Sequence, residues 1–297
     1  MATRPHAVAP SEPLCPATKN PRVVLLGSGE SAVVESEVKR LRPLIEQQVE
    51  VVLCDLEFRD GLEKVDADLV IVFGGDGSIL RAAHRMAYRQ LPVIGCNLGR
   101  LGFLAAFSAS ELLTVLPDIC SGKYSVVEHL MFECRVFRGG DVLYQKLGLN
   151  ETAVFGGPPY RMLDIQLYID SEPVTTYSCD GLIVATPVGS TAHSMSSGGP
   201  ILRKDLQAFV ISPISPHTLT NRPVVDSAER VFELMVALPN EGTAVVVDGQ
   251  LLCPLQSQDQ VRIQRAVPRF KLVEVAHHSY YRTLREKLGW GGRVRRE

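Results

Sequence analysis

The first half of the chain alternates short apolar runs with segments whose apolar residues recur at helical spacing. Four apolar runs predict strands, within residues 22–31, 49–56, 66–75 and 91–99. Helical spacing between these runs predicts two helices, over residues 32–48 and 78–90. Strands separated by helices in this way imply parallel pairing with right-handed crossovers. The first half therefore predicts an α/β domain built on a parallel sheet.

In the second half, apolar and polar residues alternate with a period of two, as in strands with one buried face. Residues 132–146 predict a hairpin that turns at Gly139-Gly140, and residues 161–187 predict another pair of strands that turn at residues 170–173. The alternation continues in three later segments, at residues 230–239, 242–255 and 260–266. This half predicts a mostly antiparallel β domain.

One segment of the second half departs from this alternation. Residues 209–225 contain several prolines, which cannot donate a hydrogen bond to a neighbouring strand. The segment is therefore interpreted as an irregular crossover rather than a strand. Its His217 is interpreted as a hydrogen-bonded structural residue rather than an acid or base.

These patterns divide the chain into four expected regions. Residues 1–20 hold four prolines and no apolar signal-peptide core, so they are interpreted as a flexible tail. The α/β domain is expected over residues 21–125 and the β-rich domain over residues 126–275. Residues 276–297 return to helical spacing, and we expect this C-terminal segment to dock on the first domain.

The composition excludes several classes of protein but does not indicate which reaction the protein catalyses. The 297 residues are 45% hydrophobic and 22% charged with a net charge of -2, which is typical of an ordinary globular protein and argues against nucleic-acid binding. No apolar run approaches the ~18 residues of a membrane helix. The seven cysteines form no C-x-x-C pair and the histidines show no metal-binding spacing, so we expect no protein-held metal, a reducing compartment and a cytoplasmic location.

The first candidate for chemistry is a glycine loop between a predicted strand and the following helix. Gly74, Gly75 and Gly77 allow backbone N–H groups to face phosphates at the edge of the sheet where ligands bind. The loop lacks the lysine of a P-loop and the G-x-G-x-x-G spacing, and it contains Asp76 instead. An aspartate beside a helix N-terminus is stabilised as the anion and can orient or deprotonate a hydroxyl. The alternative is that Asp76 only caps the helix.

Two further segments carry polar or small residues inside apolar surroundings. Asn150-Glu151 interrupts a β-like run, although such a pair is also ordinary in a loop. Residues 179–202 combine Asp180-Gly181 with many glycines, serines and threonines between two apolar stretches. A surface that lies close to a ligand needs such small residues, whereas a flexible linker would not have apolar stretches on both sides.

Taken in order, these segments resemble the NAD kinase family. The resemblance rests on GGDGS (74–78), NLGRLGFL (97–104), Asn150-Glu151, DGLIVATPVGSTAHS (180–194) with SSGGPI, ISPISPHTLTNRP (211–223) and VDGQ (247–250). It extends from about Val23 to Trp290. GGDG alone also occurs in lipid kinases of the diacylglycerol type, so the later motifs make the resemblance specific.

The resemblance implies a fold of the NAD kinase and diacylglycerol kinase type, with a Rossmann-like first domain and an NAD-binding β domain. It implies transfer of the γ-phosphoryl group of ATP, with Mg²⁺, to the 2′-hydroxyl of the adenosine ribose of NAD, and assigns activation of that hydroxyl to Asp76. It also implies a homodimer or homotetramer. The nucleotide-binding residues it implies are Gly74, Gly75, Gly77, Ser78, Arg81, Phe103, Asn150, Glu151, Asp180, Ser190, Thr191, Ala192, His193, Ser196, Ala208 and Gln250.

Two residues depart from the family pattern. Ser78 replaces the usual threonine and keeps the hydroxyl group. His193 replaces the usual tyrosine, and because an imidazole titrates near neutrality it leaves nucleotide affinity and its pH dependence open. Two alternative functions also remain at this point: a lipid kinase of the same superfamily, and a non-catalytic sensor of NAD(H). The sequence does not choose between NAD and NADH, or between ATP and polyphosphate.

Overall fold

The chain folds into two units, as a computed structural model shows for residues 20–29, 31–99, 101–218, 220–275 and 280–289. Unit 1 comprises Met1–Glu128 together with Lys271–Glu297, and unit 2 comprises His129–Phe270. The expected tail lies outside the described residues except for Asn20. Of the expected C-terminal segment, residues 280–289 are described.

Unit 1 is built on a seven-stranded sheet with the order β2-β1-β3-β4-β19-β6, and β5 pairs with β4. Pairing is parallel between β1 and each of β2 and β3, and between β4 and each of β3, β5 and β19. This confirms the predicted parallel sheet. The strands are β1 (Arg22–Gly27), β2 (Glu50–Asp55), β3 (Leu69–Phe73), β4 (Pro92–Asn97), β5 (Phe107–Ser108), β6 (Ser125–His129) and β19 (Phe270–Glu274).

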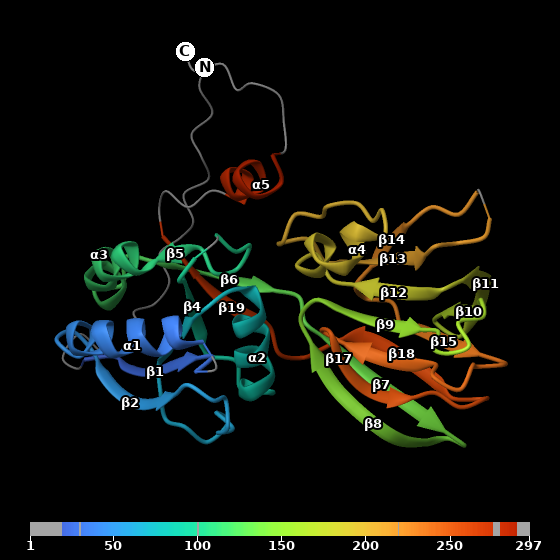
Figure 1. Cartoon of the computed structure of the whole chain (residues 1–297), viewed down its shortest axis with the longest axis horizontal. Helices are drawn as coiled ribbons and strands as arrows, with labels where there is room; N and C mark the ends of the chain where they lie inside the picture. Colours follow the sequence, from blue (N-terminus) through green and yellow to red (C-terminus); the bar gives the residue numbers. More distant parts are fainter. Residues whose placement is uncertain (1–19, 30, 100, 219, 276–279, 290–297) are drawn as a thin grey trace, which may run out of the picture. The chain divides into compact units, whose positions relative to one another are not determined.

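Helices α1, α2 and α3 lie beside the strands of this sheet (Figure 1), and apolar side chains at helical spacing join α1 and α3 to it. The buried face of α1 is formed by Val34, Val38, Leu41 and Ile45, which join the sheet and α3 in one apolar cluster. In α3, Ser108 and Glu111 form a capping box at the N-terminus. The helices are α1 (Ala32–Ile45), α2 (Asp76–Met86), α3 (Ala109–Cys120) and α5 (Tyr280–Leu288).

Unit 2 consists of two six-stranded antiparallel sheets. One has the order β11-β10-β15-β18-β7-β8, and the other has the order β14-β13-β12-β9-β16-β17. The first sheet contains β7 (Phe132–Arg138), β8 (Asp141–Gly148), β10 (Leu163–Ile169), β11 (Glu172–Cys179), β15 (Phe232–Val236) and β18 (Gln260–Arg265). The second contains β9 (Glu151–Phe155), β12 (Gly181–Ala185), β13 (Ala208–Ile214), β14 (Val224–Ser227), β16 (Ala244–Val247) and β17 (Gln250–Pro254).

The core of unit 2 lies between its two sheets. Alternate side chains of both sheets point into it, for example Phe132 and Cys134 of β7 and Leu182 and Val184 of β12, and they form one apolar cluster. The opposite face of β12 is also covered, because Ile183 packs in a second apolar cluster with Leu202, from the segment that follows α4 (His193–Ser196), and Val210 of β13. The predicted antiparallel β domain, including the β7–β8 hairpin, is confirmed.

The structure corrects the interpretation of residues 209–225. Most of the first part is strand β13, which pairs with β12 and β14, and Val224 and Val225 belong to β14. β13 contains Pro213, which has no N–H to donate. It is tolerated because β14 pairs with β13 only as far as Ile211, so that at Pro213 the strand has a neighbour, β12, on one side only. The prolines beyond β13 lie in the connection between the two strands.

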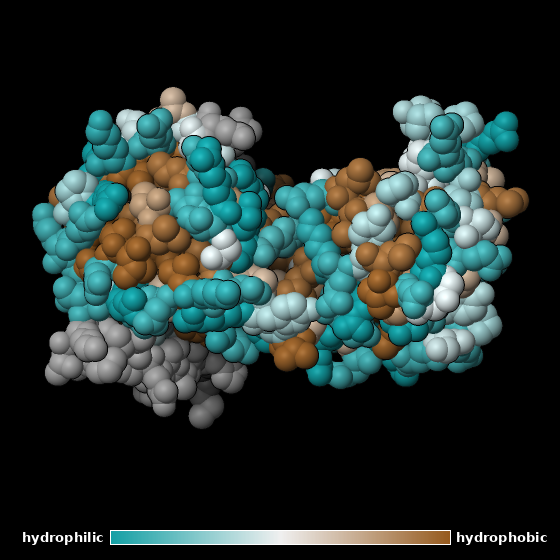
Figure 2. All heavy atoms as spheres, turned by 90° about the horizontal axis from the view of Figure 1, so that it is seen from below, coloured by the Kyte–Doolittle hydropathy of each residue, from teal (hydrophilic) through white to brown (hydrophobic). Residues whose placement is uncertain are grey.

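The surface mixes polar and apolar side chains, as is normal for a globular protein. Figure 2 shows hydrophilic side chains over much of the visible face of both units, with hydrophobic ones between them. Within the described part of the chain, no helix combines the length and apolar character needed to cross a membrane.

Candidate functional site

The glycine loop joins the carboxyl end of β3 to the first residue of α2. Gly74 has φ of 140°, a conformation that favours glycine, and a Cβ there would overlap the Ser78 hydroxyl. Its N–H donates to the Cys96 carbonyl at 2.9 Å, which ties the loop to β4. Gly75 is the N-cap of α2 with φ of -90°, so the alternative of Asp76 as the cap residue is wrong.

The carboxylate of Asp76 holds a second loop of unit 1 in place. Oδ1 accepts hydrogen bonds from the N–H groups of Leu104 at 2.8 Å and Ala105 at 3.1 Å, and Oδ2 accepts one from Phe103 at 2.8 Å. A Cβ on Gly102 would overlap Oδ1, so this approach requires glycine. The glycine loop and the loop at residues 102–105 therefore form one assembly around a single carboxylate.

A lysine from the end of the chain completes the surroundings of Asp76. The Lys287 ammonium of α5 lies 3.4 Å from Asp76 Oδ2 and 4.3 Å from the centroid of the Phe103 ring. Burial alone would raise the pKa of Asp76, but the three backbone N–H groups and the charge of Lys287 outweigh it, and the pKa is lowered. Asp76 is therefore an anion at neutral pH. Sequence reasoning did not select Lys287, because nothing in its local pattern distinguishes it from other helix cations.

The space in front of the glycine loop is open. A Cβ on Gly75 or Gly77 would meet no atom of the described residues within 4 Å. The carboxyl ends of β1 and β2 lead to a cavity of about 600 Å³, which is lined by Ser28, Gly29, Glu35, Leu56, Glu57, Arg59 and Arg81. Arg81 belongs to α2, and its guanidinium lies 4.3 Å from the centroid of the Phe58 ring. Of the expected nucleotide-binding residues, only Arg81 lines this cavity.

Unit 2 contains a second aspartate that binds three consecutive backbone N–H groups. Asp248, in the turn between β16 and β17, accepts from Leu149 and Asn150 at 2.8 Å and from Glu151 at 3.1 Å. Its own N–H donates to the Glu151 carbonyl at 2.9 Å. Asp248 thus fixes the backbone of the Asn150-Glu151 pair. It belongs to the VDGQ motif, but only Gln250 of that motif was expected at the site.

Glu151 is a buried carboxyl group with an unused oxygen. Its side chain is 7% exposed, and Oε2 has no hydrogen-bond partner within the described part of the chain. Burial and the nearby charge of Asp248 raise its pKa to about 8, while the backbone N–H of His193 acts in the opposite direction. Glu151 is therefore largely protonated at neutral pH and presents a carboxylic acid that can donate a hydrogen bond.

The small-residue segment after β12 is folded rather than extended. It forms a turn of 3-10 helix at Gly189–Thr191 and a short helix, α4, at His193–Ser196. A Cβ on Gly189 would overlap the Asn150 carbonyl, so glycine allows this turn to lie against the Asn150-Glu151 backbone. Thr186 reinforces the contact, because its N–H donates to the Asn150 carbonyl at 2.8 Å.

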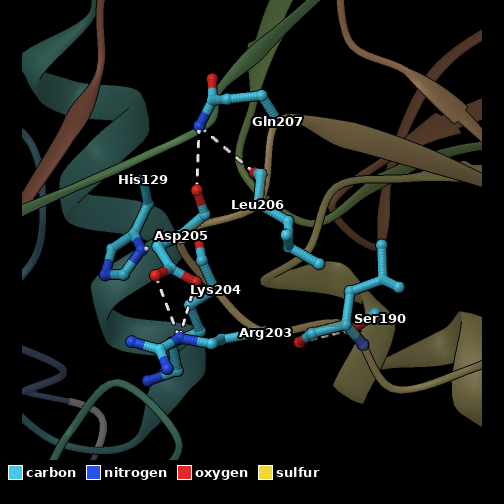
Figure 3. A network of polar contacts seen from close by, with 8 residues as sticks. His129, Ser190, Arg203, Lys204, Asp205, Leu206 and Gln207 are labelled. Carbon is cyan, nitrogen blue, oxygen red and sulfur yellow. Dashed lines mark hydrogen bonds and ion pairs between the residues drawn. The ribbon is translucent and has the colours of Figure 1, made fainter.

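Ser190 faces the interior of unit 2, although the resemblance implies a ligand contact. Its fully buried hydroxyl donates to the Pro187 carbonyl at 2.6 Å and accepts from the Leu202 N–H at 2.9 Å. Figure 3 shows Ser190 beside the segment at residues 203–207, where Lys204 contacts the ring of His129 through its carbonyl. The hydroxyl of Ser190 therefore fixes the segment that follows α4.

The other expected residues of unit 2 have mixed positions. His193 stacks on Phe155, with ring centroids 5.3 Å apart, and Thr191 donates its hydroxyl to the Val188 carbonyl at 3.0 Å. Ala192 and Ala208 are half-buried, whereas Ser196, Asp180 and Gln250 are exposed. Gln250 accepts a hydrogen bond from Lys146 at 2.7 Å. The structure thus brings the 189–196 segment against Asn150 and Glu151, whose backbone is held by Asp248.

Within the described residues, no group of three or more His, Cys, Asp or Glu side chains is arranged to hold a metal ion. The carboxylate of Asp76 already binds three backbone N–H groups, and the raised pKa of Glu151 keeps that carboxyl group largely protonated at neutral pH. A divalent cation at this site would be held mainly by nucleotide phosphates and water, as Mg²⁺ often is, rather than by protein side chains.

Comparison with known proteins decides which family these features belong to. Two family models match the chain, the ATP-NAD kinase N-terminal domain at residues 24–124 and the ATP-NAD kinase C-terminal domain at residues 149–275. The chain belongs to the NAD kinase family. A protein named NAD kinase from Rhodopirellula baltica is 53% identical over 280 residues, which cover 94% of this chain and 90% of the relative. Another from Geotalea daltonii is 37% identical over 92% of this chain and 96% of its own.

Solved structures of NAD and NADH kinases share the fold. The yeast NADH kinase complexed with NADH superposes with a TM-score of 0.81 at 21% identity, over 94% of this chain and 90% of that one. An NAD kinase from Archaeoglobus fulgidus in complex with ATP superposes with a TM-score of 0.70 at 30% identity, over 91% of this chain and 100% of that one. The predicted fold and the predicted family are both confirmed.

Proposed function

We propose that this protein is an NAD kinase that transfers the γ-phosphoryl group of ATP to the 2′-hydroxyl of the adenosine ribose of NAD, giving NADP. The observation that carries this proposal is Asp76, an ionised carboxylate held by three backbone N–H groups beside a glycine loop that is open in front. Membership of the NAD kinase family supports the choice of substrates. A pure NAD sensor would gain nothing from an anion beside bound phosphates, which it would repel.

In the proposed reaction the 2′-oxygen forms a bond to the γ-phosphorus while the bond to the β–γ bridging oxygen breaks. The bridging oxygen keeps the electron pair and leaves with ADP, and the proton of the hydroxyl passes to Asp76. Because the pKa of Asp76 is lowered, its main contribution is to orient the hydroxyl and to accept the proton late in the transfer. The N–H groups of the glycine loop would face the phosphates.

We take Mg–ATP as the phosphoryl donor. A bound Mg²⁺ supplies neutralisation of the phosphate charge during transfer. The glycine loop offers backbone N–H groups and no second carboxylate among its own residues, so the cation is assigned to the nucleotide rather than to a protein cage. We propose that Arg81, which lines the cavity in unit 1, contacts phosphate through its guanidinium group.

Recognition of NAD is proposed for unit 2. Asn150 and Glu151 would bind ribose hydroxyls or the base, with the protonated Glu151 as a donor. Asp180, Thr191, Ala192, His193, Ser196, Ala208 and Gln250 remain the proposed dinucleotide contacts. Ser190 is proposed to act only by fixing the backbone, since its hydroxyl is occupied. We further propose a homodimer or homotetramer. We also propose a cytoplasmic enzyme, which the free thiols of Cys54, Cys96, Cys134, Cys179 and Cys253 support.

A coupled assay tests the function against its rivals. Purified protein with Mg–ATP is given NAD, NADH or diacylglycerol vesicles as acceptor, and NADP, NADPH or phosphatidic acid is measured. We expect NADP from NAD at a rate far above that with the lipid. Phosphatidic acid as the main product would support the lipid kinase, and NAD binding with no product from any acceptor would support the sensor.

A further inference from the structure

The carboxylate of Asp76 has no free acceptor position in this structure. A carboxylate offers about four such positions, two on each oxygen. Oδ1 accepts from Leu104 and Ala105, and Oδ2 accepts from Phe103 and from the Lys287 ammonium. A substrate hydroxyl can therefore reach Asp76 only if one of these four donors leaves.

The geometry identifies the donor that leaves. The three backbone N–H groups belong to one loop and lie 2.8 to 3.1 Å from the carboxylate, so removing any of them would disturb the loop. The Lys287 contact is longer, at 3.4 Å, near the outer limit of a hydrogen bond. It also comes from a flexible four-carbon side chain that is partly exposed to solvent. Lys287 is therefore the donor whose hydrogen bond to Asp76 can be broken with the smallest loss of free energy.

We propose that Lys287 is a further catalytic residue of this kinase: it occupies the hydroxyl-binding position on Asp76 in the empty enzyme and, once displaced by the 2′-hydroxyl, places its ammonium group beside the transferring phosphoryl group. This inference rests on the proposed NAD kinase function. The displaced ammonium keeps a second partner at the site, because Nζ lies 4.3 Å from the centroid of the Phe103 ring and the Phe103 N–H binds the same carboxylate.

A second cation beside the phosphoryl group, in addition to Mg²⁺, favours the step. The attacking oxygen and the phosphoryl group approach Asp76 together, and both carry negative charge as the transfer proceeds. An ammonium released from Asp76 at that moment neutralises this charge without leaving the site. The glycine loop itself contains no lysine, so α5 would supply from the end of the chain what a P-loop supplies within its own sequence.

The test compares Lys287→Met with Lys287→Arg and with Arg285→Met. Lys287→Met keeps the length and apolar part of the side chain and removes the charge, whereas Lys287→Arg keeps the charge. Arg285→Met removes an exposed cation two positions away on the same helix and serves as the matched control. NADP formation by the wild-type protein is measured first. If the wild type forms no NADP, the proposed NAD kinase function is contradicted, and the variants say nothing about Lys287.

With an active wild type, we expect Lys287→Met to lower kcat by about 10- to 100-fold, because one charged group is lost from the transition state. The dissociation constant of NAD without ATP should stay equal or fall by up to about 3-fold, since the hydroxyl no longer competes with the lysine. Lys287→Arg should keep kcat within about 5-fold of wild type, and Arg285→Met within about 2-fold.

Several results would overturn the proposal. An unchanged kcat in Lys287→Met would make the ion pair an ordinary surface contact. A raised kcat would make Lys287 an inhibitory occupant of Asp76. Weaker NAD binding together with a lower melting temperature would make it a structural anchor of α5. A second variant, Leu284→Ala, checks whether Lys287 is only a structural anchor, because it loosens the buried side of α5 and leaves the lysine intact. If Leu284→Ala and Lys287→Met lowered NAD affinity and melting temperature to the same extent, a catalytic role for Lys287 would be contradicted.

Discussion

The two units contain the same device, an aspartate that accepts three consecutive backbone N–H groups, in opposite electrostatic surroundings. Asp76 in unit 1 holds residues 103–105 and has Lys287 as a fourth partner. Asp248 in unit 2 holds residues 149–151 and has the buried carboxyl group of Glu151 beside it. Burial raises the pKa of Asp76, but the backbone hydrogen bonds and then the charge of Lys287 lower it, whereas burial and then the charge of Asp248 raise the pKa of Glu151.

The difference shows that hydrogen bonds alone do not decide the role of such a carboxylate. Both aspartates order a short segment that carries expected site residues. Only Asp76 is partly exposed beside an open glycine loop, where a ligand can reach it. Asp248 is buried, and it acts on substrate only through the residues that it positions. The first is proposed as a catalytic residue and the second as a positioning residue.

The largest expected effect is that of Asp76→Asn. The amide keeps the shape of the side chain but removes the anion, so kcat should fall by about 10² to 10⁴ with little change in NAD affinity. Steady-state kinetics and an NAD titration measure the two quantities separately. A variant with nearly normal turnover would mean that Asp76 only holds the loop at residues 102–105.

Gly102→Ala should disturb the same carboxylate without changing its chemistry. The added Cβ would overlap Asp76 Oδ1, so we expect kcat to fall by about 10- to 100-fold through displacement of the carboxylate. Gly99→Ala is the matched control, because a Cβ there meets no atom of the described residues within 4 Å. Equal kinetics in the two alanine variants would contradict the importance of this close approach.

Asp248→Asn tests the second aspartate. Loss of the anion weakens its hold on the backbone of Asn150-Glu151, so KM for NAD should rise by about 10-fold, and kcat at saturating NAD should stay within about 5-fold of wild type. This split between KM and kcat is the reverse of the one expected for Asp76→Asn. If both aspartate variants lost kcat alike, the distinction between catalytic and positioning roles would fail.

Glu151→Gln should give the smallest effect, on stability rather than catalysis. Burial and the charge of Asp248 raise the pKa of Glu151 from its ordinary value of 4.5 to about 8 in the folded protein, so the wild-type protein loses stability as pH rises from about 4.5 to 8. A neutral glutamine avoids that loss, and it should stabilise the protein by on the order of 4 kcal/mol at pH 8 and by little at pH 4.5. Thermal melts at both pH values measure this. A stabilisation that does not depend on pH would contradict the raised pKa.

The sequence was enough to predict most strands of both units and the chemistry that depends on neighbouring residues, although it missed α3 and misassigned residues 209–225. Apolar runs and helical spacing gave the parallel sheet of unit 1 and the antiparallel sheets of unit 2, because burial follows the local period of apolar residues. The glycine loop with Asp76 was also visible, since a strand, a turn and a helix N-terminus are adjacent in the chain. The ordered motifs pointed to the NAD kinase family for the same reason.

The tertiary structure alone decided which distant groups meet. Lys287 reaches Asp76 across 211 residues, and Asp248 reaches Asn150 across 98, and no local pattern encodes either pairing. The same holds for β19, expected in the second domain but paired with β4 of unit 1, and for the inward-facing hydroxyl of Ser190. Local spacing fixes which face of an element is buried, but hydrogen bonds and charges act through space, so their partners are set only when the chain has packed.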